Sequence, residues 1–224
     1  MNEKNILCFG DSNTWGFVPG AFDSKTFYME RYPLSVRWPG VVRNILGNEY
    51  HIIEEGLNGR TTNIEYPGLN GRSSTSYLVP CLYTHSPLEL IVIQIGINDL
   101  KTIFNRKLSM IVEGISEMID MVKGTLFGSD MQSPPEILLL TPPPLEHEKY
   151  LDENNNQVFK GGMEKSLQFH YHYSKIAKNE GCHYLDLGSK VKYSHIDGLH
   201  LDSEGHQIVG MVVANKIKEI FKRK

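Results

Sequence analysis

The sequence predicts a three-layer α/β/α sandwich built on a five-stranded parallel sheet. Short apolar runs bounded by Gly, Asn or Pro alternate along the chain with helical patterns. The apolar runs are continuous rather than alternating, which is typical of parallel strands that are buried on both faces. Because each crossover between parallel strands is right-handed and buries a face of the sheet, helices are expected on both faces. The predicted strands lie at 5–9, 50–53, 88–95, 136–140 and 183–187.

Three apolar stripes predict the helices of the outer layers. The first repeats at i, i+3, i+4, i+7 and i+8 over residues 38–46 and stops at a glycine. The second covers 108–122, and the third covers 209–221 in a helix with a basic end. Segments 16–35 and 142–162 do not fit the alternation, and we expect these long loops to form pocket walls or contacts between subunits.

Length, composition and charge limit the class of protein. The chain has 224 residues, 40% of them apolar, which is enough for one sizeable core, so we expect a single domain over 1–224. The formal net charge of −3, with no basic run, argues against nucleic acid and membranes as partners. Three widely separated cysteines favour a reducing compartment, and the amino-terminal residues hold too few apolar side chains for a signal peptide. We therefore expect a cytoplasmic protein.

Polar residues follow the predicted strands at the sheet edge where open α/β proteins bind their ligands. Ser12 follows the first strand, Gly59 the second and Asn98 the third, while Asp197 and His200 follow the fifth. Acyl transfer needs a hydroxyl, a neutral imidazole that activates it, a carboxylate that orients the imidazole, and donors for an oxyanion. The sequence therefore predicts Ser12 as nucleophile, His200 as base and Asp197 as acid.

The predicted oxyanion donors are the backbone N–H groups of Ser12 and Gly59 and the side-chain amide of Asn98. Each residue also has a simpler interpretation. Ser12 could cap a helix, and Gly59 could only permit a tight turn. Asn98 and Asp99 could both cap the next helix; we expect Asp99 to do so while Asn98 points at the pocket. Asp11 is expected to stabilise the turn rather than act as the acid.

Histidines and aromatic residues suggest further sites. The four histidines at 170, 172, 183 and 195 match no ligand spacing, so we expect no metal, and the chemistry needs no organic cofactor. Trp15 lies three residues from Ser12, where it could line an acyl pocket, although core packing is the commoner role of tryptophan.

Four sequence blocks resemble those of the SGNH or GDSL hydrolase family, in the family's order. They are Gly-Asp-Ser at 10–12, the glycine block around Gly59, Gly-Ile-Asn-Asp at 96–99 and Asp-Gly-Leu-His at 197–200. Further stretches, beginning with Gly-Asp-Ser-Asn-Thr-Trp-Gly, resemble the aryl esterases that also act as acyltransferases and perhydrolases. The resemblance implies a flavodoxin-like SGNH fold, the triad and oxyanion donors named above, short acyl esters as substrates, and a homo-oligomer, octameric in this branch.

Two positions depart from the pattern of this branch. Asn13 stands where the family usually has leucine, and the second block reads Leu57-Asn58-Gly59-Arg60 where the branch usually has serine and alanine before the arginine. These changes affect the expected pocket shape and acyl preference, so Asn13 and Asn58 join Trp15 as candidate pocket residues.

The sequence thus predicts a serine esterase that forms an acyl-enzyme on Ser12 from a small-molecule ester and can also pass the acyl group to alcohols or peroxide. Two alternatives stay open. One is a carbohydrate O-acetyl esterase, and the other is a non-catalytic ligand-binding module on the same fold.

Overall fold

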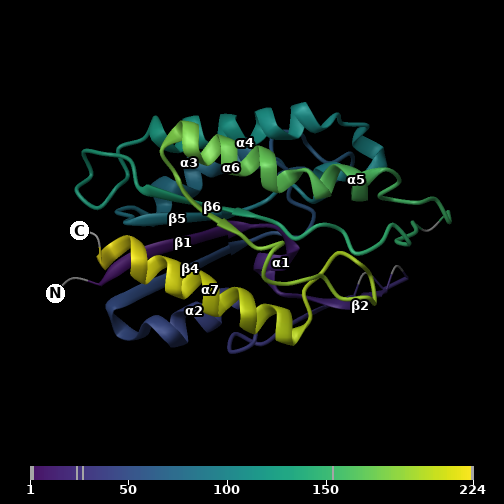
Figure 1. Ribbon diagram of the computed structural model, residues 1–224, viewed down its shortest axis with the longest axis horizontal. Helices are drawn as coiled ribbons and strands as arrows, with labels where there is room; N and C mark the ends of the chain where they lie inside the picture. The colour runs from purple at the N-terminus through teal and green to yellow at the C-terminus, as the bar shows by residue number, and fades with distance from the viewer. Residues whose placement is uncertain (1–2, 24, 27, 153, 223–224) are drawn as a thin grey trace.

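A parallel sheet forms the centre of the molecule in the computed structural model, which describes residues 3–23, 25–26, 28–152 and 154–222. Within these residues the sheet has five strands in the order β4-β1-β5-β6-β7 and is covered by helices on both faces (Figure 1). This confirms the predicted three-layer α/β/α fold. The strands are β1 (Lys4–Gly10), β4 (Tyr50–Gly56), β5 (Leu90–Gln94), β6 (Glu136–Thr141) and β7 (His183–Asp186).

Strand β1 lies between two parallel neighbours. Its residues pair with β4 from Lys4 opposite Tyr50 to Gly10 opposite Gly56, and it pairs with β5 on its other side. Its four central side chains, residues 6–9, are fully buried, which explains why the strand is a continuous apolar run. The chain continues from β1 to one neighbour and later to the other, so the carboxyl end of β1 is a topological switch point.

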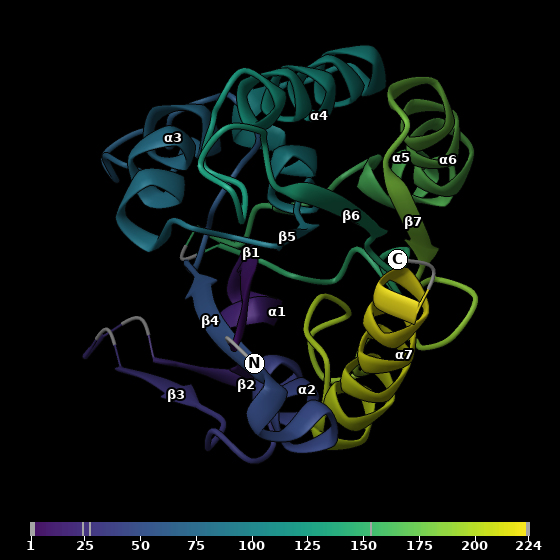
Figure 2. The same ribbon diagram turned by 90° about the vertical axis from the view of Figure 1, so that its left-hand side faces the viewer.

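Helices cover each of the two faces of the sheet (Figure 2). On the first face α2 (Trp38–Leu46) packs against α7 (Ser203–Lys222). Gly210 permits this approach, because a Cβ atom there would collide with Val41 of α2. The other face carries α3 (Ser74–His85), α4 (Leu108–Lys123) and α6 (Phe169–Glu180), with the short α5 (Gly162–Leu167) preceding α6. The first, second and third predicted stripes correspond to α2, α4 and α7.

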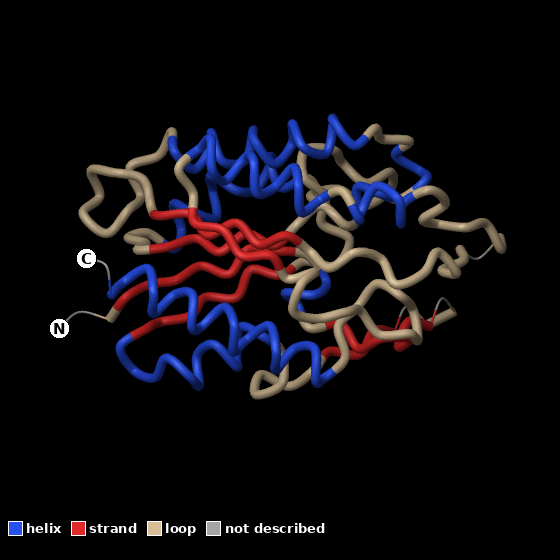
Figure 3. Tube along the Cα trace, viewed as in Figure 1, coloured by secondary structure: helices blue, strands red, loops and turns tan. Residues whose placement is uncertain are grey.

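Segment 16–35 is not the loop that we expected. It contains β2 (Phe17–Asp23) and β3 (Tyr28–Arg31), which pair antiparallel as a separate two-stranded sheet. Pro19 interrupts the pattern expected of a strand, so the sequence does not predict β2. Proline is nevertheless compatible with an edge strand, and both strands of a two-stranded sheet are edge strands. The hairpin lies beyond the carboxyl end of the main sheet, next to several loops (Figure 3).

Helices α3 and α6 were missed because neither has a clear apolar stripe in the sequence. Helix α3 contains Pro80, and the buried positions of α6 lie among histidines, tyrosines and lysines. None of the helices in the described part of the chain combines the length and the apolar character that a membrane span requires.

Candidate active site

Ser12 is the first residue of α1 (Ser12–Trp15), the short helix that directly follows β1. The side chain of Asp11 caps this helix, since its Oδ1 accepts the N–H of Asn13 at 2.9 Å. Gly10 is required beside it, because a Cβ atom at residue 10 would lie 2.6 Å from the carbonyl oxygen of Gln94 in β5. Asp11 therefore stabilises the turn as predicted and holds Ser12 at the switch point of the sheet.

Ser12, His200 and Asp197 form one hydrogen-bonded series. The Oγ of Ser12 lies 2.9 Å from Nε2 of His200, and Nδ1 of His200 lies 2.8 Å from Oδ2 of Asp197. All three side chains are buried. With the Nδ1 proton held by the carboxylate, the imidazole presents an unprotonated Nε2 that accepts the Ser12 hydroxyl proton.

The Asp197 carboxylate is held by more than the imidazole. Its Oδ1 accepts the backbone N–H groups of Leu199 and His200 at 3.1 and 3.0 Å, and its Oδ2 also accepts the N–H of Gly20 in β2 at 3.2 Å. Burial raises the pKa of Asp197, but the hydrogen bonds and charge of His200 outweigh burial, so that its pKa lies below the ordinary value. The carboxylate is therefore ionised near neutral pH.

Asn13 does not line the pocket, which corrects the prediction. Its side chain is 1% exposed, its Nδ2 donates to the Leu199 carbonyl at 3.2 Å, and its Oδ1 accepts the Leu201 N–H at 2.9 Å. These two peptide groups flank His200. Both polar ends of the side chain are occupied inside the protein, so Asn13 is a clamp that fixes the backbone on either side of the imidazole.

Phe17, and not Trp15, lies against the imidazole. The rings of Phe17 and His200 have centroids 4.3 Å apart and are tilted by 30°. Trp15 lies one step further away: its ring centroid is 6.4 Å from that of Phe17, and the Arg31 guanidinium lies 5.0 Å from its ring. Sequence reasoning missed Phe17 because it falls in the segment that was taken for a loop.

The turn after β4 brings Gly59 to the same sheet edge. The N–H of Leu57 donates to the Gly10 carbonyl at 3.1 Å, and Nη1 of the buried Arg60 donates to that carbonyl at 2.8 Å. Gly59 has φ +75°, a left-handed conformation that glycine adopts without strain. Among the residues described, no acceptor meets its N–H group. The turn thus offers a free donor close to the end of β1.

Asn98 is joined to this turn. It begins the 3₁₀ helix Asn98–Leu100 after β5 and is 2% exposed, and its Nδ2 donates to the Arg60 carbonyl at 3.0 Å. Only one of its two amide hydrogens is used in that bond. Asp99 does not cap a following helix, contrary to the prediction. It is fully buried, accepts two bonds from Thr62 and forms an ion pair with Arg106.

Comparisons with known proteins assign the chain to a family. The model of the GDSL-like lipase/acylhydrolase family matches residues 8–208, a range that contains the serine, the aspartate and the histidine. The chain belongs to this family. An aryl esterase from M. smegmatis is similar at 34% identity with a TM-score of 0.88, over 96% of this chain and 99% of that chain. Est24, a carbohydrate acetylesterase from Sinorhizobium meliloti, is similar at 33% identity with a TM-score of 0.88, over 97% of this chain and 100% of that chain. No curated protein matches.

The family assignment makes the chain a hydrolase of the SGNH esterase type. It leaves open the role of Asn58, the residue before Gly59 in this GDSL-family chain. Its Nδ2 donates to Sδ of Met29 in β3 at 3.4 Å, while its Oδ1 is buried without a partner among the described residues. The contact of Asn58 with substrate stays a prediction.

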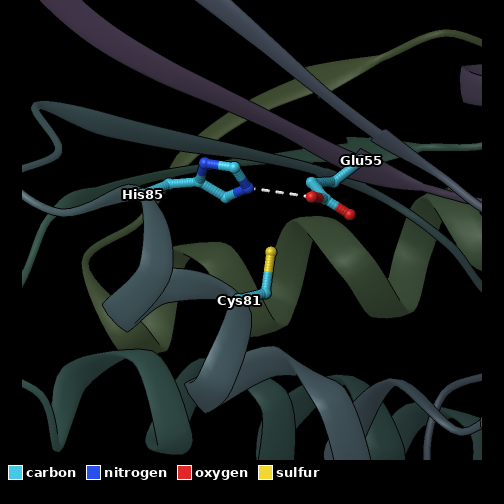
Figure 4. Close-up of side chains that lie close together, drawn as sticks. All are labelled: Glu55, Cys81 and His85. Atoms are coloured by element: carbon cyan, nitrogen blue, oxygen red, sulfur yellow. Dashed lines mark hydrogen bonds and ion pairs between the residues drawn. The ribbon is translucent and has the colours of Figure 1, made fainter.

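Potential metal ligands meet at one group in the described parts of this GDSL-family chain, formed by Glu55, Cys81 and His85 (Figure 4). The Oε1 of Glu55 lies 2.9 Å from Nε2 of His85. Burial and the Glu55 charge raise the pKa of the Cys81 thiol to about 12, so a metal would have to displace its proton. The spacing of Cys81 and His85 on one helix is the sequence signal for this group. The group is a carboxylate–imidazole pair beside a neutral thiol.

Proposed function

We propose that the protein is a carboxylic ester hydrolase with Ser12 as its nucleophile and short-chain acyl esters as its substrates. One observation carries the proposal: the uninterrupted series of hydrogen bonds from Ser12 Oγ through His200 to the buried, ionised Asp197. A helix-capping serine would need neither the imidazole nor the carboxylate.

The first half of the reaction follows from this geometry. As Ser12 Oγ attacks the ester carbonyl carbon, Nε2 of His200 takes the hydroxyl proton, and Asp197 stabilises the imidazolium that forms. The developing oxyanion is met by the N–H groups of Ser12 and Gly59 and by the free amide hydrogen of Asn98. A single donor of this kind contributes about 3–4 kcal/mol to stabilising the transition state. His200 then protonates the departing alcohol, which leaves an acyl group on Ser12.

The second half resolves the acyl-enzyme. Water attacks with His200 as base, or an alcohol or peroxide attacks in its place and receives the acyl group. The ring of Phe17 against the imidazole supports transfer, because an apolar surface beside the base disfavours water relative to a less polar acceptor.

A carbohydrate O-acetyl esterase is the second candidate. The similarity to Est24 supports it as strongly as the similarity to the aryl esterase supports the first candidate, since identity and TM-score are nearly the same. Both candidates use the same serine and differ in the alcohol that leaves. A non-catalytic binding module is disfavoured because nucleophile, base and acid are present and hydrogen-bonded.

The test compares the protein with its Ser12→Ala variant on p-nitrophenyl acetate, butyrate and octanoate and on an acetylated xylo-oligosaccharide. Loss of activity in a variant with unchanged circular dichroism supports Ser12 as nucleophile. Faster release of acetate from the oligosaccharide than from p-nitrophenyl acetate favours the second candidate. Equal activity in both proteins contradicts the proposal.

We also propose a homo-oligomer. Support comes from the hairpin of β2 and β3, on which Phe22, Tyr28 and Met29 are exposed by 43%, 61% and 43%. Light scattering after size exclusion that gives the mass of a monomer would contradict it.

A further inference from the structure

Two cationic side chains lie beside the turn that carries Gly59. Lys101 directly follows the 3₁₀ helix of Asn98, and its backbone N–H donates to the Asn98 carbonyl at 3.1 Å. Arg72 comes from the other side, where its carbonyl accepts the Thr61 N–H at 3.0 Å. The main chain of both residues is therefore held by the same segments that hold the candidate oxyanion donors.

The ring of Tyr66 lies next to Lys101 and also borders the space beside Gly59. The Nζ of Lys101 lies 5.0 Å from the Tyr66 ring centroid and 5.9 Å from that of Phe159. A Cβ atom at Gly59 would lie 3.6 Å from Nε of Arg72 and 3.9 Å from Cδ2 of Tyr66. The space next to Gly59 is thus bordered by a guanidinium and by an aromatic ring that carries an ammonium group.

Neither cation has an anionic partner within the described ranges. Arg72 Nε is buried and unpaired there, and neither side chain takes part in an ion pair. Glu65, the acid nearest to Arg72 in sequence, accepts the backbone N–H groups of Arg72 and Ser73 instead of the guanidinium. By contrast, the buried Arg106 forms an ion pair with the Asp99 carboxylate.

Burial and charged groups of both signs act on the pKa of Lys101. Burial lowers the pKa of Lys101 to about 8, Asp11 and Asp99 raise it, and Arg72 lowers it further. Those two carboxylates are themselves buried and occupied, Asp11 by the N–H of Asn13 and Asp99 by Arg106. An incoming anion would stabilise both cations at once.

We propose that Arg72 and Lys101 form a subsite for an anionic substituent, a carboxylate or a phosphate, carried by the ester substrate. The inference rests on the proposed function, because it places this substituent a few bonds from the carbonyl that faces Gly59. Tyr66, which holds Lys101 over its ring and contacts Phe104 edge-to-face, borders the same space and positions the ammonium group. The substrate class is then a short acyl ester whose alcohol or acyl part is negatively charged.

The experiment uses esters that differ only in charge. The pair 4-acetoxybenzoate and its methyl ester carries the charge on the alcohol side, and phenyl hydrogen succinate with its methyl ester carries it on the acyl side. The kcat/KM ratio of anionic to neutral ester is measured for the unmodified protein, for Lys101→Met and for Arg72→Gln. Lys160→Met is the matched control, because Lys160 is an exposed cation beside Phe159.

We expect a ratio above one for one of the two pairs, and a fall of about ten-fold in Lys101→Met and in Arg72→Gln, with little change in the control. The pair that shows the preference assigns the charge to the alcohol or to the acyl side. Equal losses on neutral and anionic esters overturn the proposal, since they mean that the cations act on the oxyanion itself. A ratio unaffected by both substitutions also overturns it.

Binding is measured separately, so that failure of the esterase proposal can be distinguished from failure of the subsite. Calorimetric titration of the Ser12→Ala variant compares 4-acetoxybenzoate and phenyl hydrogen succinate with their methyl esters. Tighter binding of an anion, weakened about ten-fold by adding Lys101→Met, supports the subsite even if no ester is hydrolysed. Equal binding of the charged and neutral members of both pairs overturns it.

Discussion

Replacing Asn13 by leucine tests whether the clamp on the backbone around His200 matters for the reaction. Leucine has a similar volume, and it is the residue that the family usually has at this position. It has no polar side-chain atoms, so it can neither accept the Leu201 N–H nor donate to the Leu199 carbonyl. Both peptide groups are buried, and the substitution leaves each without its side-chain partner.

The expected magnitude follows from those two bonds. Each buried backbone group that loses its partner costs about 1–3 kcal/mol of stability. Burying the apolar side chain of leucine in place of a polar one offsets part of this loss. We therefore expect the free energy of unfolding to fall by about 2–4 kcal/mol. Loosening of the backbone at His200 misplaces Nε2 relative to Ser12, and displacements of about 1 Å lower catalysis by roughly 100-fold, so kcat should fall about 10- to 100-fold with a smaller change in KM.

The assay combines urea denaturation with hydrolysis of p-nitrophenyl acetate. Asn13→Ala serves as the second variant, because it removes the same two hydrogen bonds without the bulk of leucine and without adding a charge. We expect kcat of this variant to fall about as far as that of Asn13→Leu. If Asn13→Leu stays within two-fold in kcat and about 0.5 kcal/mol in stability, the clamp has no functional role.

Three further predictions concern charged groups. Asp197→Asn is expected to lower kcat on p-nitrophenyl acetate by roughly 10³- to 10⁴-fold, because the amide favours the wrong tautomer of His200; a loss below ten-fold contradicts this. Arg106→Met leaves the Asp99 carboxylate buried without its cation, and urea denaturation should show a loss of about 3–5 kcal/mol, whereas a loss below 1 kcal/mol contradicts the buried ion pair. Since the pKa of Lys101 is lowered to about 8, its charge is present below pH 8 and lost above it. The kcat/KM ratio of anionic to neutral ester should therefore fall between pH 7 and 9, and a flat ratio contradicts the role of Lys101.

The central sheet could be predicted because each of its strands is a continuous apolar run between turn residues. The relation of Ser12 to His200 could also be predicted, since parallel strands place their carboxyl ends at one edge. The same rule placed Gly59 and Asn98 there.

Other contacts have no local signal in the sequence. The clamp of Asn13 joins residues 186 and 188 positions apart, and an asparagine after a serine is equally compatible with a pocket wall. The stacking of Phe17 on His200 depends on a hairpin whose pattern is obscured by Pro19. Asp99 was assigned to a helix cap because its partner, Arg106, follows after a second short 3₁₀ turn that periodicity does not show.

The 188 positions that separate Ser12 from His200 have a consequence for the order of events during synthesis. The strand that carries the hydroxyl is translated first, while the loop that carries the imidazole and the carboxylate emerges only after all five strands of the sheet. A nascent or truncated chain can therefore present Ser12 in a formed turn and still lack a base. The onset of esterase activity would then mark the last stage of assembly, and a time course of activity during cell-free translation would follow the docking of the carboxyl-terminal helix rather than the formation of the sheet.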